Sequence, residues 1–291
     1  MQGNNVVRPA WGEPSGRQLE PFETFSTIDP AQWQDKEPPR RDWMVENCFL
    51  RGTVALVSGD GGIGKSLLMQ QLCTSAVLGR SWLGMSLTAG RALYLACEDD
   101  QDELWRRQVA INKALDVEMA DVGDAGLALK PRVGQDNAIM RFERDGWKMK
   151  ETGLWRSIAR YCRDNGVQYV VMDPASHLFD GNAREERQVI DFIAMLRRLA
   201  MLLQGVVIIT KHPSMSGRAQ GTGMGGSTQW EDAVRTRLYL RRDKNKNLSL
   251  TGMKANYGPR LEEIPLVWRR GVIERFTAEA AAPVNYYDQD V

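Results

Sequence analysis

Between residues 54 and 66 the chain reads VALVSGDGGIGKS, and this stretch decides the fold. Its first four residues, Val54–Val57, are apolar, as in a strand of a buried parallel sheet. The apolar stretch Leu67–Leu72 that follows is expected to be helical. The turn between them matches the spacing G-x-x-x-x-G-K-[ST] at Gly59, Gly64, Lys65 and Ser66. A glycine-rich turn between a strand and a helix predicts a phosphate-binding loop, and the alternative is a chance turn.

The residue types of this turn suit a nucleoside triphosphate. Glycines let the backbone wrap closely and point its N–H groups toward phosphate oxygens. The helix that follows presents the positive end of its dipole to the same anion. Lys65 is expected to reach the β- and γ-phosphates of ATP, and the Ser66 hydroxyl to bind Mg²⁺. The expected nucleotide-binding residues are Gly59, Gly61, Gly62, Gly64, Lys65, Ser66 and Leu67.

The composition argues against several classes of protein. A length of 291 residues allows one or two domains, and a net charge of +1 gives no overall argument for nucleic acid. Four scattered cysteines and two histidines do not favour a zinc site. The first 30 residues lack the apolar stretch of a signal peptide. The most apolar region, Phe192–Thr210, contains Arg197 and Arg198 and cannot span a bilayer. We expect a soluble cytoplasmic protein with no membrane partner.

The chain divides into three parts by composition. Residues 1–37 are polar and contain several prolines, so they are expected to form a flexible or docking arm. The apolar anchors of this arm are Phe22, Phe25 and Trp33. Residues 38–276 are expected to form one ATPase domain. The remaining tail, 277–291, is Ala-rich and then acidic.

Apolar runs alternate with helical patterns through most of the expected domain. The expected strands are 54–57, 92–96, 127–131, 168–172 and 206–210, and the expected helices are 65–78, 100–115, 153–163 and 185–203. Beyond Arg235 the pattern changes to short runs at 238–240, 248–251 and 264–268. We therefore predict an α/β fold with a mostly parallel central sheet, helices on both faces and an antiparallel C-terminal strand extension.

Two of the expected strands lead into carboxylates. Asp173 closes one of them, at a position from which a carboxylate holds Mg²⁺ through water. The strand expected beside the phosphate loop leads into three acids, and a carboxylate there can take a proton from an attacking water. Glu98 is the first of the three and is our expected general base. Asp99 is left undecided, and Asp100 is assigned to opening the next helix.

A histidine follows the last strand of the alternating pattern. Lys211, His212 and Pro213 come directly after the run Val206–Thr210. A polar side chain at this strand end would lie over the γ-phosphate and sense hydrolysis. A lone histidine is usually structural, so position alone leaves both interpretations of His212 open.

Taken together, the motifs resemble those of RepA-type plasmid replicative helicases, which belong to the RecA-like hexameric ATPases. The resemblance covers roughly residues 38–276. It rests on Gly59–Ser66, Glu98-Asp99 with Arg107 eight residues after Asp99, Asp173, His212, Arg235 and the string Lys254-Ala255-Asn256-Tyr257-Gly258. The phosphate loop alone fits many families that hydrolyse nucleotides. The Glu-Asp…Arg spacing together with the Lys-Ala-Asn-Tyr-Gly string fits far fewer families.

The resemblance implies roles for individual residues. Glu98 would be the catalytic base, His212 the γ-phosphate sensor, and Arg235 a finger that enters the site of the neighbouring subunit. It also implies ATP hydrolysis with Mg²⁺ by a homo-hexameric ring on single-stranded DNA. Replication-initiator or primase proteins are the further partners expected. The chain departs from the family by having Lys211-His212 where the family has a histidine pair, and by its longer N-terminal arm.

Two segments are candidates for DNA contact, because RecA-like rings place two loops in their central channel. They are 176–187 and 214–228, and the second is Gly-rich and expected to have no structure of its own. Apart from Phe179, they lack the aromatic residues that stack on single-stranded bases. The residues expected to neutralise DNA phosphates are Arg184, Arg187 and Arg218. The alternative is a solvated surface loop.

Three functions compete at this point. The first is a ring motor that translocates on single-stranded DNA, with either polarity, and unwinds duplex in the replication of a plasmid, phage or integrative element. The second is a RecA-like ATPase that acts as a recombination or repair mediator or regulator without unwinding. The third is a non-catalytic nucleotide-binding module, and Glu98 argues against it because a pure switch needs no base.

Overall fold

The computed structural model describes residues 26–143 and 148–277. The chain divides into two units, Met1–Arg40 and Arg41–Val291. All of the expected strands and helices lie in the second unit.

The first unit is described from residue 26 onward. There the Asp29 side chain accepts a hydrogen bond from the Ala31 amide and begins a 3₁₀ helix, η1 (Pro30–Trp33). Trp33 is 60% exposed. The other two apolar anchors predicted for the arm, Phe22 and Phe25, lie outside the described residues.

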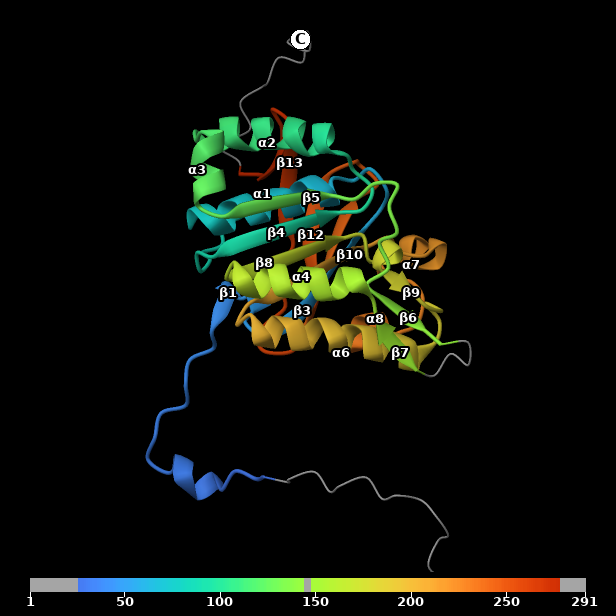
Figure 1. Cartoon of the computed structure of the whole chain (residues 1–291). Helices are drawn as coiled ribbons and strands as arrows, with labels where there is room; N and C mark the ends of the chain where they lie inside the picture. Colours follow the sequence, from blue (N-terminus) through green and yellow to red (C-terminus); the bar gives the residue numbers. More distant parts are fainter. Residues whose placement is uncertain (1–25, 144–147, 278–291) are drawn as a thin grey trace, which may run out of the picture. The chain divides into compact units, whose positions relative to one another are not determined.

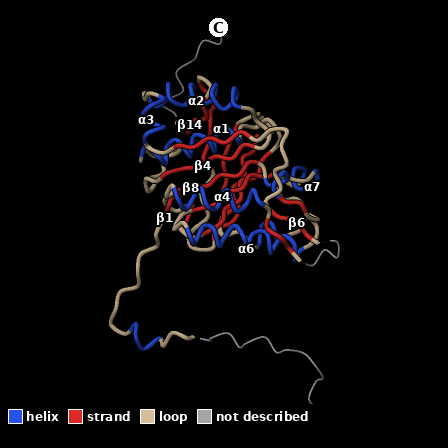
Figure 2. The backbone as a smooth tube through the Cα atoms, in the orientation of Figure 1, coloured by secondary structure: helices blue, strands red, loops and turns tan. Residues whose placement is uncertain are grey.

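A nine-stranded sheet forms the centre of the second unit, in the order β14-β13-β12-β11-β3-β10-β8-β4-β5 (Figures 1 and 2). Six neighbouring strands, from β11 to β5, run parallel to one another. The bounds are β3 (Thr53–Gly59), β4 (Arg91–Ala96), β5 (Leu127–Pro131), β8 (Val167–Asp173), β10 (Val206–Lys211), β11 (Thr236–Arg242), β12 (Leu248–Ala255), β13 (Ile264–Arg269) and β14 (Val272–Arg275). The predicted α/β class is confirmed.

Helices cover both faces of this sheet (Figure 1). One core lies between the sheet and α1 (Lys65–Leu78) and α2 (Gln101–Leu115), and a second lies against α4 (Gly153–Asp164) and α6 (Glu186–Leu202). The short helix α3 (Met119–Asp124) contacts α1 and β5. The strands lie between the two cores, and all seven residues of β3 are buried. This burial on both faces explains the uninterrupted apolar runs of the sequence.

The caps of α1 and α2 follow from the local sequence. Asp100 accepts a hydrogen bond from the Glu103 amide and caps α2, the role that its position predicts. Gly64 caps α1 without any side-chain hydrogen bond. The first amides of α1 therefore stay available to an anion.

The C-terminal extension differs from the prediction in its first strand. β11 pairs with β3 in parallel, and the antiparallel pairing begins only between β11 and β12. After β10 the chain crosses back to the end of the sheet where β3 begins. The strand β11 starts there and therefore runs parallel to β3. The sequence pattern also missed β14, which pairs with β13.

Two smaller sheets were not predicted. One pairs β1 (Trp43–Val45) with β2 (Phe49–Leu50), and the other joins β6 (Met140–Phe142), β7 (Met149–Glu151) and β9 (Phe179–Asp180). Their strands have two or three residues, too few for a periodic pattern.

The segments expected to be loops carry short helices. The prediction that 214–228 has no structure of its own was wrong in part, because Ser214 caps the helix α7 (Met215–Ala219). A further turn, α8 (Gln229–Asp232), follows it. Segment 176–187 overlaps α5 (Ala175–Leu178) and contains β9.

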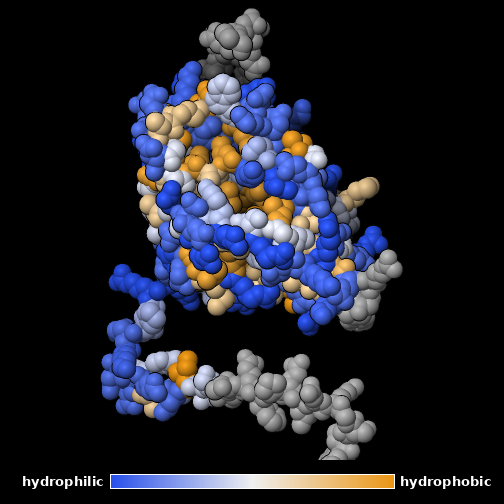
Figure 3. Space-filling view, in the orientation of Figure 1, coloured by the Kyte–Doolittle hydropathy of each residue, from blue (hydrophilic) through white to orange (hydrophobic). Residues whose placement is uncertain are grey.

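The surface carries an apolar hollow that the helices leave open (Figure 3). It measures about 460 Å³ and lies between α4 and the edge strand β5. Its apolar lining includes Leu93, Leu95, Leu129, Leu154 and Ile158. Across the described ranges, no helix is long and apolar enough to cross a membrane.

Candidate active site

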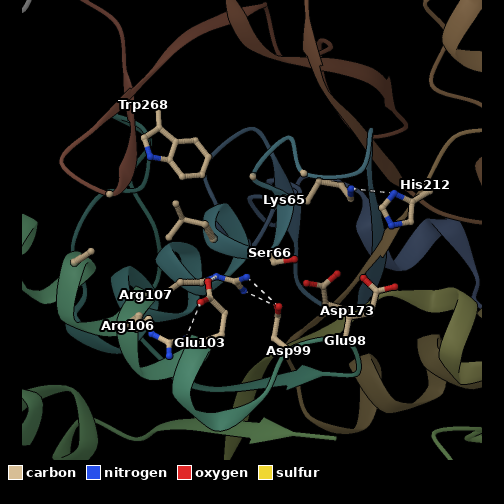
Figure 4. Close-up of a pocket in the computed structure, with 15 residues that line it drawn as sticks. Lys65, Ser66, Glu98, Asp99, Glu103, Arg106, Arg107, Asp173, His212 and Trp268 are labelled. Atoms are coloured by element: carbon tan, nitrogen blue, oxygen red, sulfur yellow. Dashed lines mark hydrogen bonds and ion pairs between the residues drawn. The ribbon is translucent and has the colours of Figure 1, made fainter. Parts of the chain in front are cut away.

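A cavity of about 530 Å³ lies where the parallel strands β3, β4, β8 and β10 end (Figure 4). Parallel strands bring their carboxyl ends to one edge of the sheet, and ligands bind there in open α/β folds. The cavity gathers most of the predicted site residues, namely Gly62, Gly64, Lys65, Ser66, Leu67, Glu98, Asp173 and His212. Its other lining residues are Asp99, Glu103, Arg106, Arg107, Ala110, Trp268 and Gly271.

The phosphate loop needs glycine at three of its four predicted positions. Gly62 and Gly64 have φ of 69° and 106°, in the left-handed region. A Cβ atom on Gly59 would lie 2.7 Å from the Leu240 carbonyl oxygen, which is too close. Gly61 has open space around it and tolerates a side chain by this criterion.

Lys65 lies at the centre of the loop. Its ammonium donates hydrogen bonds to the carbonyls of Gly59 and Asp60, both at 2.8 Å, and lies 3.3 Å from His212 Nδ1. Burial lowers the pKa of Lys65, and the carboxylates of Asp173 and Glu98 oppose that shift. The site thus holds a cation where the triphosphate charge would lie.

Asp173 is the last residue of β8 and is 5% exposed. The Tyr94 hydroxyl donates to its Oδ2 at 2.5 Å, and the Thr210 hydroxyl donates to Oδ1. Asp173 and Ser66 both line the cavity, and Figure 4 shows the Asp173 carboxylate next to the Ser66 side chain. A fixed carboxylate beside a serine hydroxyl is a donor set of oxygens that suits Mg²⁺.

Glu98 and Asp99, the two acids considered for the general base, have different surroundings in the structure. Arg107 donates to both oxygens of Asp99, at 2.6 and 3.0 Å, so Asp99 is committed to a two-pronged ion pair. Glu98 faces the cavity with its side chain 48% exposed. Of the two, Glu98 has the carboxylate that is open to a substrate water.

His212 and Lys211 point to different places, although they are adjacent. Lys211 donates to the Gly225 carbonyl at 2.6 Å and lies over the Trp230 ring, 5.3 Å from its centre. His212 lines the cavity. Burial, and then the nearby Lys65 ammonium, lower the pKa of His212, so its imidazole is neutral at pH 7.

Arg235 lies away from this cavity. Its amide donates to the Val54 carbonyl at 3.1 Å, at the start of β3, whereas β11 reaches the phosphate loop only at Leu240, opposite Gly59. The Lys-Ala-Asn-Tyr-Gly string begins at the same far edge, because Lys254 is paired with Arg237 and the Asn256 amide donates to the Arg235 carbonyl.

Of the three arginines predicted to contact DNA, Arg184 and Arg187 lie around the start of α6, whereas Arg218 lies in α7. Arg184 and Arg187 are exposed, and Arg187 forms an ion pair with Asp191 at 3.2 Å. Arg218 lies beside the phosphate loop, where its Nε is 3.0 Å from the Asp60 carboxylate. Segment 214–228 is therefore tied to the loop that binds phosphate.

Sequence reasoning missed Trp268, which lines the cavity from β13. Its side chain is 47% exposed, and a Cβ atom on Gly64 would lie 2.8 Å from its Cζ3 atom. The ring thus packs against the phosphate loop with part of its surface open. No motif marked this residue, because a part of the chain distant in sequence brings it to the site; a tryptophan near the end of a short apolar run was the available signal.

The fold and this cavity define a P-loop ATPase. A parallel sheet, a glycine-rich loop at a helix start, the Lys65-Ser66 pair of the motif and an aspartate at the end of a parallel strand in the same sheet occur together. The model of the AAA domain family matches residues 18–218, and the chain belongs to this family of nucleotide-binding ATPases. A search among curated proteins found no match.

Proposed function

We propose that the protein is an ATP-driven ring motor that translocates on single-stranded DNA and unwinds duplex during replication of a plasmid, phage or integrative element. One observation supports this proposal: the cavity brings together Lys65, Glu98 and Asp173 at the carboxyl ends of the strands, while Arg235 lies at the opposite ends of the strands of the same sheet. An arginine so placed is too far from the cavity of its own chain to act there, and we propose that it serves the site of another subunit.

The residues of the cavity divide the work of ATP hydrolysis. The backbone of the phosphate loop and Lys65 hold the β- and γ-phosphates. Ser66 and Asp173 would hold Mg²⁺, which when bound neutralises charge on the phosphate oxygens. Glu98 removes a proton from the attacking water through its open carboxylate oxygen. His212 donates a hydrogen bond from its neutral ring toward the γ-phosphate.

The contacts around segment 214–228 support a link from nucleotide to DNA. Arg218 is paired with Asp60 of the phosphate loop, and Lys211, next to His212, is bonded to Gly225. A change at the γ-phosphate therefore reaches both sides of this segment. Arg218 exchanges its carboxylate partner for a DNA phosphate when the segment binds DNA.

Arg235 would act in trans as the finger of a homo-hexamer. It has no side-chain hydrogen bond or ion pair within the described part of the chain, and its Nε atom is buried without a partner. An arginine that crosses an interface to a γ-phosphate stabilises the charge of the transition state. Replication-initiator or primase proteins are the further partners that we propose, and the N-terminal arm, residues 1–37, is a proposed docking segment.

A second candidate function is a recombination or repair mediator that hydrolyses ATP without unwinding. The observation that favours it concerns Phe179, the one aromatic residue of the two proposed DNA segments. Phe179 is 8% exposed and packs edge-on against Phe192 and Trp230, with ring centres 5.2 Å apart in each pair. It is thus held in the core, and no aromatic platform for bases is left in those segments.

Two measurements test the proposal. Glu98→Gln should keep nucleotide affinity close to that of the wild type and lower kcat by about 10²–10⁴-fold, the range for a general base. Loss of nucleotide binding with turnover intact would assign Glu98 to a structural role. An ATP-dependent assay on a forked duplex then separates the motor from the mediator, since only the motor releases the strand.

A further inference from the structure

A histidine outside the cavity contacts the proposed base. His177 Nε2 lies 3.2 Å from Glu98 Oε1. His177 belongs to α5, four residues after Asp173, and it is not among the residues that line the cavity. Its contact with the reaction therefore passes through Glu98.

The short helix α5 holds His177 in a fixed place. Ala175 and Leu178, on either side of it, are fully buried. The Leu178 carbonyl accepts a hydrogen bond from the Ile139 amide at 3.0 Å, and Phe179 packs into the aromatic cluster already described. A side chain on a backbone anchored at both ends can orient a neighbour, because little of its own freedom remains to be lost.

Glu98 has no other side-chain partner among the described residues. The Lys65 ammonium donates to backbone carbonyls and lies beside His212, and Arg107 is taken by Asp99. Without His177, the half-exposed Glu98 side chain would rotate freely at the strand end. With it, one carboxylate oxygen is held and the other remains for the substrate water.

We propose that His177 is a positioning residue for ATP hydrolysis: its Nε2–H donates to Glu98 Oε1 and aims Oε2 at the attacking water. This inference rests on the proposed role of Glu98 as the base. The proton from water goes to Oε2 of Glu98, and His177 neither gains nor loses a proton in the step.

The test compares His177→Ala with His177→Gln in steady-state ATP hydrolysis. Loss of the orienting donor should lower kcat about 10–100-fold and leave KM within about twofold, because a misplaced catalytic group costs rate and not ground-state binding. Gln keeps an N–H donor of similar reach, so His177→Gln should recover most of the lost kcat. An alanine variant with wild-type kcat, or a glutamine variant as slow as the alanine variant, overturns the proposal.

A double variant shows whether His177 acts through Glu98. His177→Ala should have no further effect on kcat in a Glu98→Gln background, because the group that it orients is already disabled. A full additional loss in the double variant means that His177 acts elsewhere, and the proposal fails.

The same set of variants separates this inference from the proposed function. Glu98→Gln with wild-type turnover refutes Glu98 as the base and the inference with it. A slow Glu98→Gln beside a fully active His177→Ala refutes the inference alone. The melting temperature and the affinity for ADP of each variant check that the fold and the nucleotide site are intact.

Discussion

The two ends of the strands in the central sheet, their carboxyl ends and their amino ends, carry different residues. At the edge where β3, β8 and β10 end, polar side chains face one another: Lys65 lies against His212, and Asp173 accepts two hydroxyl hydrogen bonds. At the opposite edge, Lys254 donates to two backbone carbonyls of α8, and Arg235 has no side-chain partner within the described ranges. The carboxyl ends of the strands thus carry the residues of the proposed nucleotide site, whereas the amino ends carry Arg235, whose Nε atom has no partner in the described ranges. This difference supports the proposal that Arg235 completes the site of a second chain.

The largest effect on ATP hydrolysis should come from mutating one residue at each end of the strands, Lys65 and Arg235. Lys65→Ala should abolish turnover, and Arg235→Ala should lower it by about 10³–10⁵-fold, the value of an arginine finger. Mixing the two inactive proteins should restore part of the activity, because some interfaces then join an intact phosphate loop to an intact Arg235. Phosphate release from mixed and unmixed proteins at equal total concentration measures this.

The complementation needs one control and has one clear failure. Co-purification of two differently tagged variants shows that mixed assemblies form. Mixed assemblies without activity, or full turnover by dilute monomer, would falsify the assignment of Arg235. Either result would mean that each chain hydrolyses ATP without an arginine from a neighbour.

A smaller effect, on the KM for ATP, should show how the proposed nucleotide site holds the base. We propose that the nucleobase stacks on the exposed part of Trp268, and such stacking contributes about 1–2 kcal/mol. Trp268→Ala should therefore raise KM for ATP about tenfold with kcat nearly unchanged, while Trp268→Phe keeps most of the affinity. Equal KM values for ATP and inorganic triphosphate in the wild type would contradict stacking.

The DNA contact should respond to salt in a way that tests Arg218. Each phosphate contact on a single strand contributes a slope of about −0.7 to log K against log salt concentration. Arg218→Ala should flatten the slope by about that amount, and Arg163→Ala, at an exposed arginine of α4 outside both proposed DNA segments, provides the matched comparison. If Arg184, Arg187 and Arg218 can all be neutralised without change, DNA binds elsewhere on the protein.

The smallest effect concerns pH. Because the pKa of His212 is lowered in the folded protein, the unfolded chain takes up the proton first as pH falls through about 6.5. His212 therefore makes the fold less stable below that pH and has no such effect above it. The melting temperature of His212→Gln should fall less than that of the wild type between pH 7.5 and 5.5; parallel curves would show that the pKa of His212 is not lowered.

The sequence predicted the parts of the site that follow one another along the chain. Gly59–Ser66 is read directly, and Glu98 and Asp173 follow because parallel strands end at one edge. Trp268 and His177 were not predicted, because antiparallel β13 and the short helix α5 bring them in through tertiary packing. The direction of β11 was missed for the same reason, since a strand's partner is not encoded in its own pattern.

The strand β11 runs from Arg235 to the phosphate loop, where its residue Leu240 lies against Gly59. Five residues of extended chain cover roughly 16 Å and stretch very little. In the proposed ring, this strand would connect the nucleotide of one subunit to the arginine that serves the next. A shift of the phosphate loop on hydrolysis would then move Arg235 as well, so we expect the rate of ATP hydrolysis to depend on ATP concentration more steeply than a hyperbola.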